Sequence, residues 1–364
     1  MNRFPLWSPD APVTPYTEIP LPDVITHVVV ERSQHDGWHY LHETALAMHK
    51  GRLYYGWANS REKETNTSDE IYRGRSSDDG GLTWSDDFLI GPGGDDCAQN
   101  HGAMISHLDT LWCFLCRHDH GELTGTEALV RDDDSGDWSS RGIVAPGFIP
   151  FQHPLRLADG NWLMAGETAF LGDMAVALSD GDDFTTWTVV PIANAVEREL
   201  VYPETTVYPA ANGDLIAVSR VQTVGAKYTL ETPDPWHADS WGMAARSSDH
   251  GRTWSAAIPT NLPIWPSKPF AGRLSDGRAY LIHNAVHPDP AHRRDTLAIA
   301  ISAPGADLFS RIYRIRAGQC PGHAHYSNRQ WSYPSAIEVD GKLLISYSIN
   351  KSDAGLSILP LSAI

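Results

Sequence analysis

The chain has 364 residues, a formal net charge of −17 at pH 7 and a hydrophobic content of 41%. That hydrophobic content is enough for a sizeable core, which argues against a disordered chain. The acidic balance argues against a protein that binds nucleic acid or anionic membranes, because both tasks need clustered basic residues. We therefore expect neither nucleic acid nor a membrane as a partner.

The first 24 residues show no export signal, because no charged start is followed by an apolar run. No stretch approaches the 18 or so apolar residues that a membrane-spanning helix needs. The sequence predicts a cytoplasmic protein, or one whose export signal has been removed.

Paired apolar runs fill most of the chain after residue 25. A lone β-rich segment comes first, at 25–32, and six pairs with Gly-containing or Asp-containing turns follow. Apolar runs joined by such turns predict β-hairpins. The pairs are ETALAMHKGRLYYGWAN (43–59), HGAMISHLDTLWCFLCRH (101–118), HPLRLADGNWLMAGE (153–167), ETTVYPAANGDLIAVSR (204–220), KPFAGRLSDGRAYLIHN (268–284) and PSAIEVDGKLLISYS (334–348).

One turn motif occurs twice in almost the same letters, as RSSDDGGLTW (75–84) and RSSDHGRTW (246–254). Weaker copies end at Trp138 and Trp187. A repeat of roughly fifty residues is typical of the four-stranded blade of a β-propeller. We expect the Asp of each copy to bond the turn backbone, the Gly to adopt a positive φ, and the Trp to pack between neighbouring sheets. This repeat is therefore interpreted as structural.

The cysteines predict no metal or redox site. Cys113 and Cys116 form a C-x-x-C pair, but the pair lies inside a predicted strand, whereas zinc and redox sites use a turn or a helix start. We expect buried, reduced thiols, no metal and no cofactor.

Together these elements predict an all-β fold, a six-bladed β-propeller of four-stranded antiparallel blades in one domain, 1–364. The segment 25–32 is expected to close the last blade, which removes an exposed sheet edge. Seven blades remain an alternative if 285–330 contains a degenerate blade. The sequence makes no prediction of the oligomeric state.

The end of the ring opposite the turn motifs gathers the start of each first strand and the end of each second strand around a central funnel. One histidine there is readily explained as a residue bonded to backbone. Six blades that all supply polar groups at one register are better explained by a site for a polar ligand. The candidates are His42, Glu43, Asn59, Arg61, Asn100, His101, Arg117, His118, Gln152, His153, Glu167, Tyr202, Glu204, Arg220, Lys268, His283, Asn284, Tyr333 and Asn350.

The turn motifs are similar to the Asp boxes of the sialidase superfamily, and the chain resembles that family along nearly its whole length. In the first blade, Arg61 matches the family's arginine after the hairpin. Asp69 lies in the loop that carries the family's acid/base aspartate, and Glu62 or Glu64 are alternatives in the same loop.

Two further blades carry the rest of the resemblance. It implies that Tyr333 is the nucleophile, that Glu204 draws its proton and that Arg220 binds a substrate carboxylate. A neighbouring carboxylate is a reasonable activator, because a phenol is a weak nucleophile at its free pKa. Sialidases use a tyrosine in place of the usual catalytic carboxylate.

The departures from the family concern the grip on the substrate. His42 stands where the family has its first arginine, and Lys268 lies near the position of the third. Because a lysine lacks the bidentate fork of an arginine, a uronic acid or a neutral sugar is as plausible a substrate as sialic acid. His153 and Glu43 complete the predicted substrate contacts. The leading hypothesis is an exo-acting glycoside hydrolase that removes a terminal, acidic sugar from a glycan.

A second resemblance is to propeller-type polysaccharide lyases, which use two histidines, a tyrosine and an arginine. In that hypothesis Arg220 neutralises a uronate, His101 or Tyr202 takes the C5 proton, and His118 protonates the leaving oxygen. A third hypothesis is a glycan-binding propeller without catalysis, with Trp57, Trp265 and Trp331 as aromatic platforms.

Overall fold

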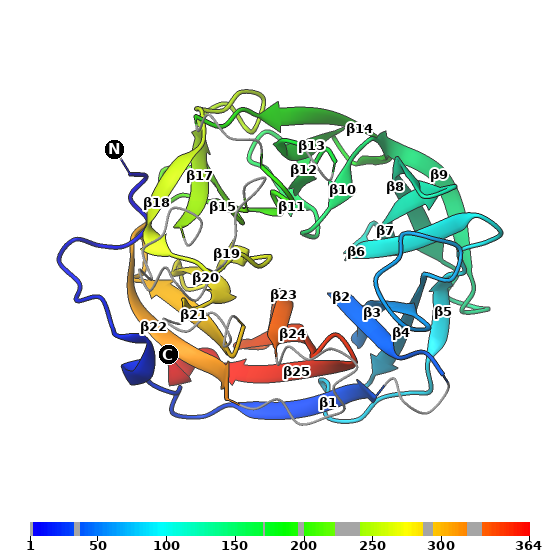
Figure 1. Ribbon diagram of the computed structural model, residues 1–364, viewed down its shortest axis with the longest axis horizontal. Helices are drawn as coiled ribbons and strands as arrows, with labels where there is room; N and C mark the ends of the chain where they lie inside the picture. Colours follow the sequence, from blue (N-terminus) through cyan, green and yellow to red (C-terminus); the bar gives the residue numbers. More distant parts are fainter. Residues whose placement is uncertain are drawn as a thin grey trace.

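The computed structural model describes residues 3–32, 37–169, 172–195, 200–222, 241–286, 294–318 and 330–364. Within these residues six antiparallel sheets stand side by side around a central axis, which makes the fold a six-bladed β-propeller (Figure 1). The predicted fold class is confirmed. Residues 294–318 belong to the outer half of blade 5 and form no seventh blade, while 287–293 and 319–329 lie outside the described residues.

Each blade runs from an inner strand at the axis to an outer strand at the rim. Blade 1 is β2(Tyr40–His49), β3(Arg52–Ser60), β4(Ile71–Ser77) and β5(Phe88–Gly91), and blade 2 is β6(Cys97–His107), β7(Thr110–Asp119), β8(Glu122–Arg131) and β9(Trp138–Pro146). In blade 3 the inner strand is split into β10(Ile149–Pro150) and β11(Leu155–Arg156), followed by β12(Trp162–Glu167), β13(Met174–Asp180) and β14(Asp183–Ile192).

The second half of the ring has the same plan. Blade 4 is β15(Thr205–Pro209), β16(Leu215–Ser219), β17(Trp241–Ser247) and β18(Ile258–Pro263), and blade 5 is β19(Phe270–Arg273), β20(Ala279–Asn284), β21(Thr296–Ser302) and β22(Phe309–Ala317). Blade 6 is β23(Trp331–Val339), β24(Lys342–Ile349) and β25(Asp353–Pro360). Short 3-10 turns lie at Tyr16–Glu18 and Leu361–Ala363. No helix in the described part of the chain is long and apolar enough to cross a membrane.

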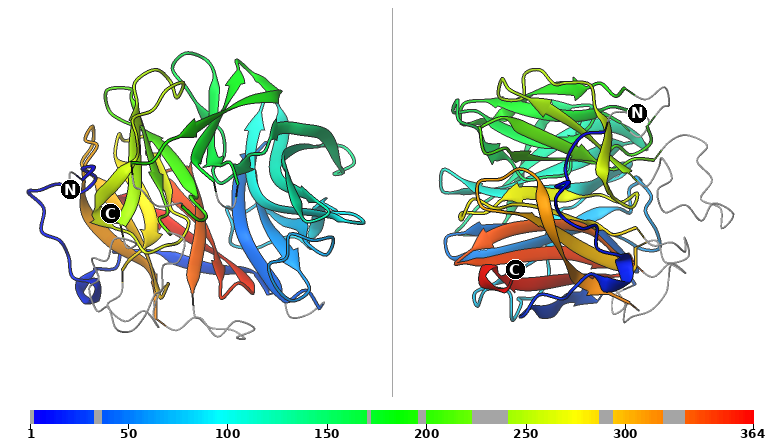
Figure 2. Two further views of the ribbon diagram at one scale, coloured as in Figure 1. Left: turned by 45° about the horizontal axis from the view of Figure 1, so that its top comes forward. Right: turned by 90° about the vertical axis from the view of Figure 1, so that its left-hand side faces the viewer.

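The N-terminal part of the chain closes the ring. Strand β1(Thr26–Arg32) pairs with β25 and becomes the outer strand of blade 6 (Figure 1). Ahead of it, the chain follows the outside of blades 4 and 5 (Figure 2), where Phe4 pairs with Thr260 and Trp7 pairs with Phe309. A strand from the start of the chain thus covers the edge of β25 that would otherwise be free.

The turn motifs join the third and fourth strands of their blades and wedge against the preceding blade. Gly81 has a φ of +95°, and a Cβ there would lie 2.4 Å from Leu356 in blade 6. Trp84 donates from Nε1 to the carbonyl of Gly81 at 3.1 Å, and Trp187 makes the equivalent bond to Phe184. Among the described residues, Trp138 Nε1 has no such partner, so its copy has lost this bond.

The cysteines of the C-x-x-C pair are free and fully buried in β7. Burial raises the pKa of both thiols well above the usual range. Such thiols are unreactive, because only the thiolate is a nucleophile or a metal ligand. Cys320 lies outside the described residues.

Three inner strands, β2, β6 and β23, share a backbone distortion at the funnel end. Register shifts that add one residue lie between His42 and Ala45, between Asn100 and Ala103, and between Ser332 and Ser335. Inside them the φ angles of Glu43, His101 and Tyr333 are positive, at 57°, 44° and 58°. Tyr202, just ahead of β15, has a φ of 52°. Bulges and positive φ at bulky residues cost free energy and concentrate at functional sites. In four blades, therefore, the backbone is strained at the residue whose side chain lies at the funnel end.

Candidate active site

Three buried residues from two blades meet in the funnel. Tyr333 on β23 donates its hydroxyl to Glu204 Oε1, just ahead of β15. Arg220, just after β16, places Nη1 3.0 Å from the same oxygen and 3.3 Å from the Tyr333 hydroxyl. All three side chains are buried. The nucleophile, proton acceptor and anion-binding arginine that the sequence predicted therefore form one hydrogen-bonded group.

The Tyr333 phenol is protonated in the resting protein. Burial raises its pKa well above the usual value, the charge of Glu204 raises it further, and Arg220 opposes both. A buried phenolate is costly unless cations offset its charge. The hydroxyl can therefore lose its proton only as Glu204 accepts it, and Arg220 contacts both partners of that transfer.

A second arginine, which the sequence analysis did not single out, lies against the same phenol. The Arg294 guanidinium is 5.6 Å from the centre of the Tyr333 ring, and it donates to Gln330 Oε1 at 3.0 Å and to the carbonyl of Pro266 at 3.1 Å. Burial and the charge of Arg220 lower its pKa. Two guanidiniums near one phenol form a natural binding site for an anion such as a carboxylate.

Sequence patterns did not indicate Arg294, because it follows a long insertion of Pro, His and Arg residues without a repeating pattern. One pattern could have pointed to Arg294. The apolar run that begins at Thr296 forms β21, and Arg294 comes two residues before it. A third strand runs antiparallel to the second, so it begins at the funnel end of its blade. A charged residue just before that start is therefore placed at the funnel.

His42 stands at the position that the resemblance assigned to an arginine, and its ring is neutral. Its ring centroid is 3.9 Å from that of Tyr333, and its Nδ1 is 2.7 Å from Ser348 Oγ. Burial lowers the pKa of His42 well below the usual value, and nearby cations lower it further. His42 therefore packs against the phenol but does not supply positive charge to a ligand.

Lys268 and His153, two more of the predicted substrate contacts, share one aromatic neighbour. Lys268 is buried and donates from Nζ to the carbonyl of Pro334 at 2.7 Å, and burial lowers its pKa to about 8. Burial lowers the pKa of His153 to about 4. Both residues pack around the Phe270 ring, with centroid distances of 5.5 Å for Lys268 Nζ and 5.6 Å for the His153 ring. Lys268 thus adds a third cationic group.

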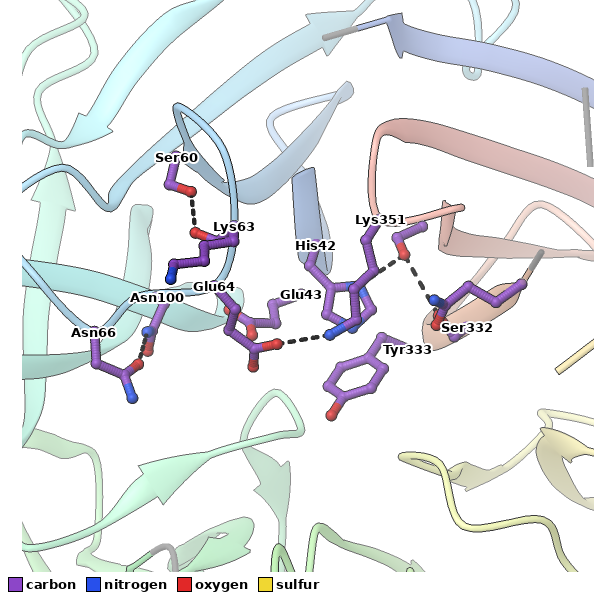
Figure 3. A network of polar contacts seen from close by, with 12 residues as sticks. His42, Glu43, Ser60, Lys63, Glu64, Asn66, Asn100, Ser332, Tyr333 and Lys351 are labelled. Atoms are coloured by element: carbon purple, nitrogen blue, oxygen red, sulfur yellow. Dashed lines mark hydrogen bonds and ion pairs between the residues drawn. The ribbon is translucent and has the colours of Figure 1, made fainter. Parts of the chain in front are cut away.

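Carboxylates dominate the side of the funnel formed by blades 1 and 2. Lys351 from the last blade binds Glu64 with an Nζ to Oε2 distance of 2.6 Å, beside His42 (Figure 3). Glu43 accepts the backbone N–H of His101 at 3.1 Å, and its other oxygen lies 3.3 Å from His101 Nε2. The ligand atoms of Glu43, Glu64 and His101 lie within 4.8 Å of one another, a spacing that could also hold a metal ion.

The acidic groups on this side differ in protonation. Burial raises the pKa of Glu43 well above the usual value, and the charges of Glu64 and Glu70 raise it further. Burial and Glu64 raise the pKa of Glu70 to about 7. The Glu64 side chain is 37% exposed, so burial raises its pKa only partly, and the ion pair with Lys351 outweighs that effect and gives a pKa of about 2. At neutral pH Glu64 is ionised, while Glu43 beside it keeps a proton.

Three residues predicted for this side, Asp69, Arg61 and Glu62, make other contacts or are exposed. Asp69 accepts hydrogen bonds from Thr65 Oγ1 at 3.1 Å and from Thr67 Oγ1 at 2.7 Å, so it stabilises its own loop. Arg61 is exposed, with its guanidinium 4.8 Å from the centre of the Trp38 ring. Glu62 is exposed as well. Of the three loop carboxylates, Glu64 is the one whose charge acts on Tyr333.

The residues named for elimination chemistry line the same funnel. Burial lowers the pKa of His101 to about 3 and that of His118 to about 4, so both rings are neutral. His118 Nδ1 is 3.7 Å from Cys116 Sγ. The Arg220 guanidinium lies 5.0 Å from the centre of the Tyr202 ring. Arg220 is thus shared by both predicted catalytic sets.

Buried polar atoms without a partner gather around this funnel. Buried groups are normally hydrogen-bonded, and each exception needs an explanation. A polar ligand in the funnel would give these atoms hydrogen-bond partners. Among the described residues they include His42 Nε2, Glu43 Oε1, Asn100 Oδ1, His101 Nδ1, His153 Nδ1, Glu167 Oε2 and Glu204 Oε2.

Comparisons with solved structures place the fold among known propellers. The structure is similar to a protein of unknown function from Dyadobacter fermentans, at 18% identity and a TM-score of 0.68, over 92% of this chain and 99% of that one. It is similar to the Hadza microbial sialidase Hz136, at 15% identity and a TM-score of 0.69, over 93% and 69%. Trypanosoma rangeli sialidase with 2,3-difluorosialic acid gives 12% identity and a TM-score of 0.67, over 95% and 60%.

Identities this low establish the fold and leave the activity open. No curated protein sequence matches the chain. The model of the BNR repeat-like domain family matches residues 51–345, which is most of the chain. The resemblance read from the turn motifs is thereby confirmed: the chain belongs to the BNR repeat-like domain family and has a sialidase-like propeller fold.

Proposed function

We propose that this protein is a glycoside hydrolase that removes a terminal, acidic sugar from a glycan, with Tyr333 as the nucleophile. The observation that supports this most is the shared contact of Tyr333, Glu204 and Arg220. A phenol bonded to a carboxylate can attack an anomeric carbon, because the carboxylate takes its proton during the attack.

Glu204 would accept the phenolic proton as the bond between Tyr333 and the sugar forms. Arg220 then stabilises the new distribution of charge, since its Nη1 faces both oxygens. Water would later hydrolyse the glycosyl–tyrosine bond and return the proton from Glu204 to Tyr333. The two displacements retain the configuration of the sugar.

The leaving group needs a proton, and we assign its supply to the pair of Glu43 and Glu64. Glu43 holds a proton at neutral pH while Glu64 is ionised by Lys351, so the pair shares one proton. A carboxylic acid kept neutral by burial and by a like charge is the usual form of a general acid. Glu43 is then the proton donor, and Glu64, from the loop to which the resemblance assigned the acid/base residue, supplies the negative charge that keeps Glu43 neutral.

The substrate would carry a carboxylate near its anomeric carbon. Arg220 and Arg294 flank the Tyr333 ring, and both present guanidinium groups suited to a carboxylate. Because His42 is neutral, the grip consists of two arginines and Lys268 and lacks the third arginine of a three-arginine clamp. A terminal uronic acid, which has a smaller ring substituent than sialic acid, fits this reduced set as well as sialic acid does.

The test is incubation of the protein with sialosides, uronic-acid-capped oligosaccharides and ulvan-like polymers. New reducing ends without absorbance near 235 nm, and their loss in the Tyr333→Phe variant, are expected. Cleavage that persists in Tyr333→Phe would contradict the proposal.

A uronate lyase is the second candidate, favoured by two neutral histidines, His101 and His118, and by the contact of Arg220 with the Tyr202 ring. Neutral imidazoles can accept a C5 proton, and Arg220 can neutralise the uronate. The same assay separates the two, because elimination leaves an unsaturated uronate that absorbs near 235 nm. That absorbance with intact activity in Tyr333→Phe would replace the hydrolase proposal.

A further inference from the structure

The opposite end of the inner strands holds a second cavity, of about 380 Å³. It is lined by the later halves of strands such as β2, β6, β15 and β23 and by two of the funnel candidates, Gln152 and His153, whereas Glu43, His101 and Tyr333 lie at the strand starts. Met48, Met104 and Ile105 give it an apolar wall, and Ser106 adds a hydroxyl. The proposed hydrolase uses none of these residues.

Ser106 is the first member of a hydrogen-bonded chain that leaves this cavity. Its Oγ is 2.8 Å from His49 Nδ1, and His49 Nε2 is 3.1 Å from Asp133 Oδ1. His49 is 2% exposed. Lys50 and Arg131 hold the Asp133 carboxylate at 2.6 and 3.2 Å. A hydroxyl, an imidazole and an ionised carboxylate are thus aligned across two blades.

The carboxylate decides which nitrogen of His49 carries the proton. An ionised Asp133 can only accept a hydrogen bond, so Nε2 is the protonated nitrogen and Nδ1 presents its lone pair to Ser106. A serine becomes a nucleophile when an imidazole oriented in this way takes its proton. Such triads are identified by geometry and role, and they recur on unrelated folds.

Two other serine–histidine pairs in the chain provide an internal comparison. His42 Nδ1 is 2.7 Å from Ser348 Oγ, and His27 Nδ1 is 2.8 Å from Ser357 Oγ. In the described part of the chain neither of these histidines has a carboxylate on Nε2, and Ser348 and Ser357 are fully buried. The Ser106 pair alone combines an orienting carboxylate with a place on a cavity wall.

We propose that Ser106, His49 and Asp133 form an acyl-transfer site that hydrolyses small esters, on the face of the ring opposite Tyr333. Ser106 Oγ would bond to the ester carbonyl carbon as its proton moves to His49 Nδ1. The carbon–oxygen bond to the alcohol then breaks, and His49 returns the proton to the leaving alkoxide. Water, deprotonated by His49, releases the carboxylic acid and restores Ser106.

The cavity suits a short acyl group. The methionine and isoleucine side chains offer an apolar surface for it, and β6 is the innermost strand of its sheet. Within the described residues, one edge of β6 therefore has no partner strand. Gln99 and His101 at its start donate their N–H groups to Glu70 and Glu43, so the N–H groups of its later half, beside Ser106, would be the donors for an oxyanion. This ester site uses none of the residues proposed for the glycosidase.

The test is covalent labelling of the full chain with an alkyl fluorophosphonate, followed by mass spectrometry of the peptides. Ser106 Oγ is expected to displace fluoride and carry the adduct. Ser106→Ala should abolish labelling, and Asp133→Asn should slow it at least tenfold. Lys50→Met removes another contact of Asp133 and should change the rate less than twofold, and Tyr333→Phe should leave labelling unchanged.

Two results would overturn the proposal. One is a folded wild-type protein that carries no adduct at Ser106. The other is an adduct whose rate is the same in Asp133→Asn, which would mean that the serine is exposed but not activated. Thermal unfolding of each variant checks that it is folded, and loss of glycosidase activity in Tyr333→Phe alone keeps the two sites distinguishable.

Discussion

The turn motifs at the rim and the funnel at the opposite end of the ring both use carboxylates, and they hold them in different ways. Asp79 accepts the backbone N–H groups of Leu82 and Thr83 at 3.0 and 2.9 Å and the Thr83 hydroxyl at 2.6 Å. Bonds from Thr83 lower its pKa below the usual range. In the repeat copy, Asp249 makes equivalent bonds to Thr253, and its pKa falls to about 2.

In the described part of the funnel, three glutamates each leave one carboxylate oxygen without a hydrogen bond. Glu43 Oε1, Glu167 Oε2 and Glu204 Oε2 are buried without a hydrogen bond among the described residues. Burial raises the pKa of Glu43 and Glu167 well above the usual value. A satisfied carboxylate stabilises its turn, whereas an unsatisfied one is costly and is retained for chemistry. Asp79 and Asp249 therefore stabilise the fold, whereas Glu43, Glu167 and Glu204 are candidates for binding or catalysis.

The largest expected effect is on activity alone. Tyr333→Phe removes the nucleophilic oxygen and should lower kcat/KM for the acidic glycoside by ~10³-fold or more. Steady-state hydrolysis measures this. Tyr347→Phe is the matched control, because Tyr347 is a buried tyrosine of the same blade whose hydroxyl accepts from Ser357. Equal losses in both variants would show that the effect is structural.

Arg294→Gln should weaken binding of the substrate carboxylate. We expect a rise in KM of roughly 10- to 100-fold for an acidic glycoside, because a charge-assisted contact with a guanidinium is lost. The neutral glycoside of the same leaving group should change little. A similar rise in KM for both substrates would contradict anion binding by Arg294.

Gly81→Ala should damage the fold and spare the site. The added Cβ meets Leu356 at 2.4 Å in a residue with φ of +95°, so we expect a loss of roughly 2 to 3 kcal/mol in the free energy of unfolding. Urea unfolding measures it, and kcat/KM of the folded fraction should not change. Glu204→Gln is the converse variant, with activity lost and stability kept. A variant that lowers activity and the free energy of unfolding equally would contradict the division between structural residues at the rim and acting residues in the funnel.

The smallest expected effect is the dependence of stability on pH. Burial lowers the pKa of His283 to about 4, against an ordinary value near 6.5. Between these values the unfolded chain binds more protons than the folded one, so the free energy of unfolding falls as the pH drops from 6.5 towards 4. His283→Gln should reduce the fall between pH 7 and pH 5 by roughly 1 to 2 kcal/mol. An unchanged fall in urea unfolding would mean that His283 is protonated in the folded protein.

Local patterns were sufficient to predict the blades. Each hairpin needs only alternating apolar residues and a turn that tolerates positive φ, and the Asp, Gly and Trp of the turn motif act within ten residues of one another. The same logic placed Tyr333, Glu204 and Arg220, because each lies at the funnel end of a recognisable hairpin strand.

Residues on irregular segments were not predictable in this way. Arg294 follows an insertion that has no periodic pattern, and the choice among Glu62, Glu64 and Asp69 depends on how one loop folds. That loop turns Asp69 towards Thr65 and Thr67, and it brings Glu64 to Lys351 from the last blade. Glu64 and Lys351 are 287 residues apart in the sequence, and no local pattern around either residue predicts their contact.

By itself, the sequence determined the all-β class, the six hairpin units, the turns between strands and the end of the ring where polar groups collect. These depend on local periodicity and turn chemistry. The tertiary structure alone decided which side chains meet: Arg294 beside Arg220, Lys351 on Glu64, and His49 between Ser106 and Asp133. The reason is that closing the ring brings distant segments to one axis, and only there do burial and neighbouring charges set the protonation of each group.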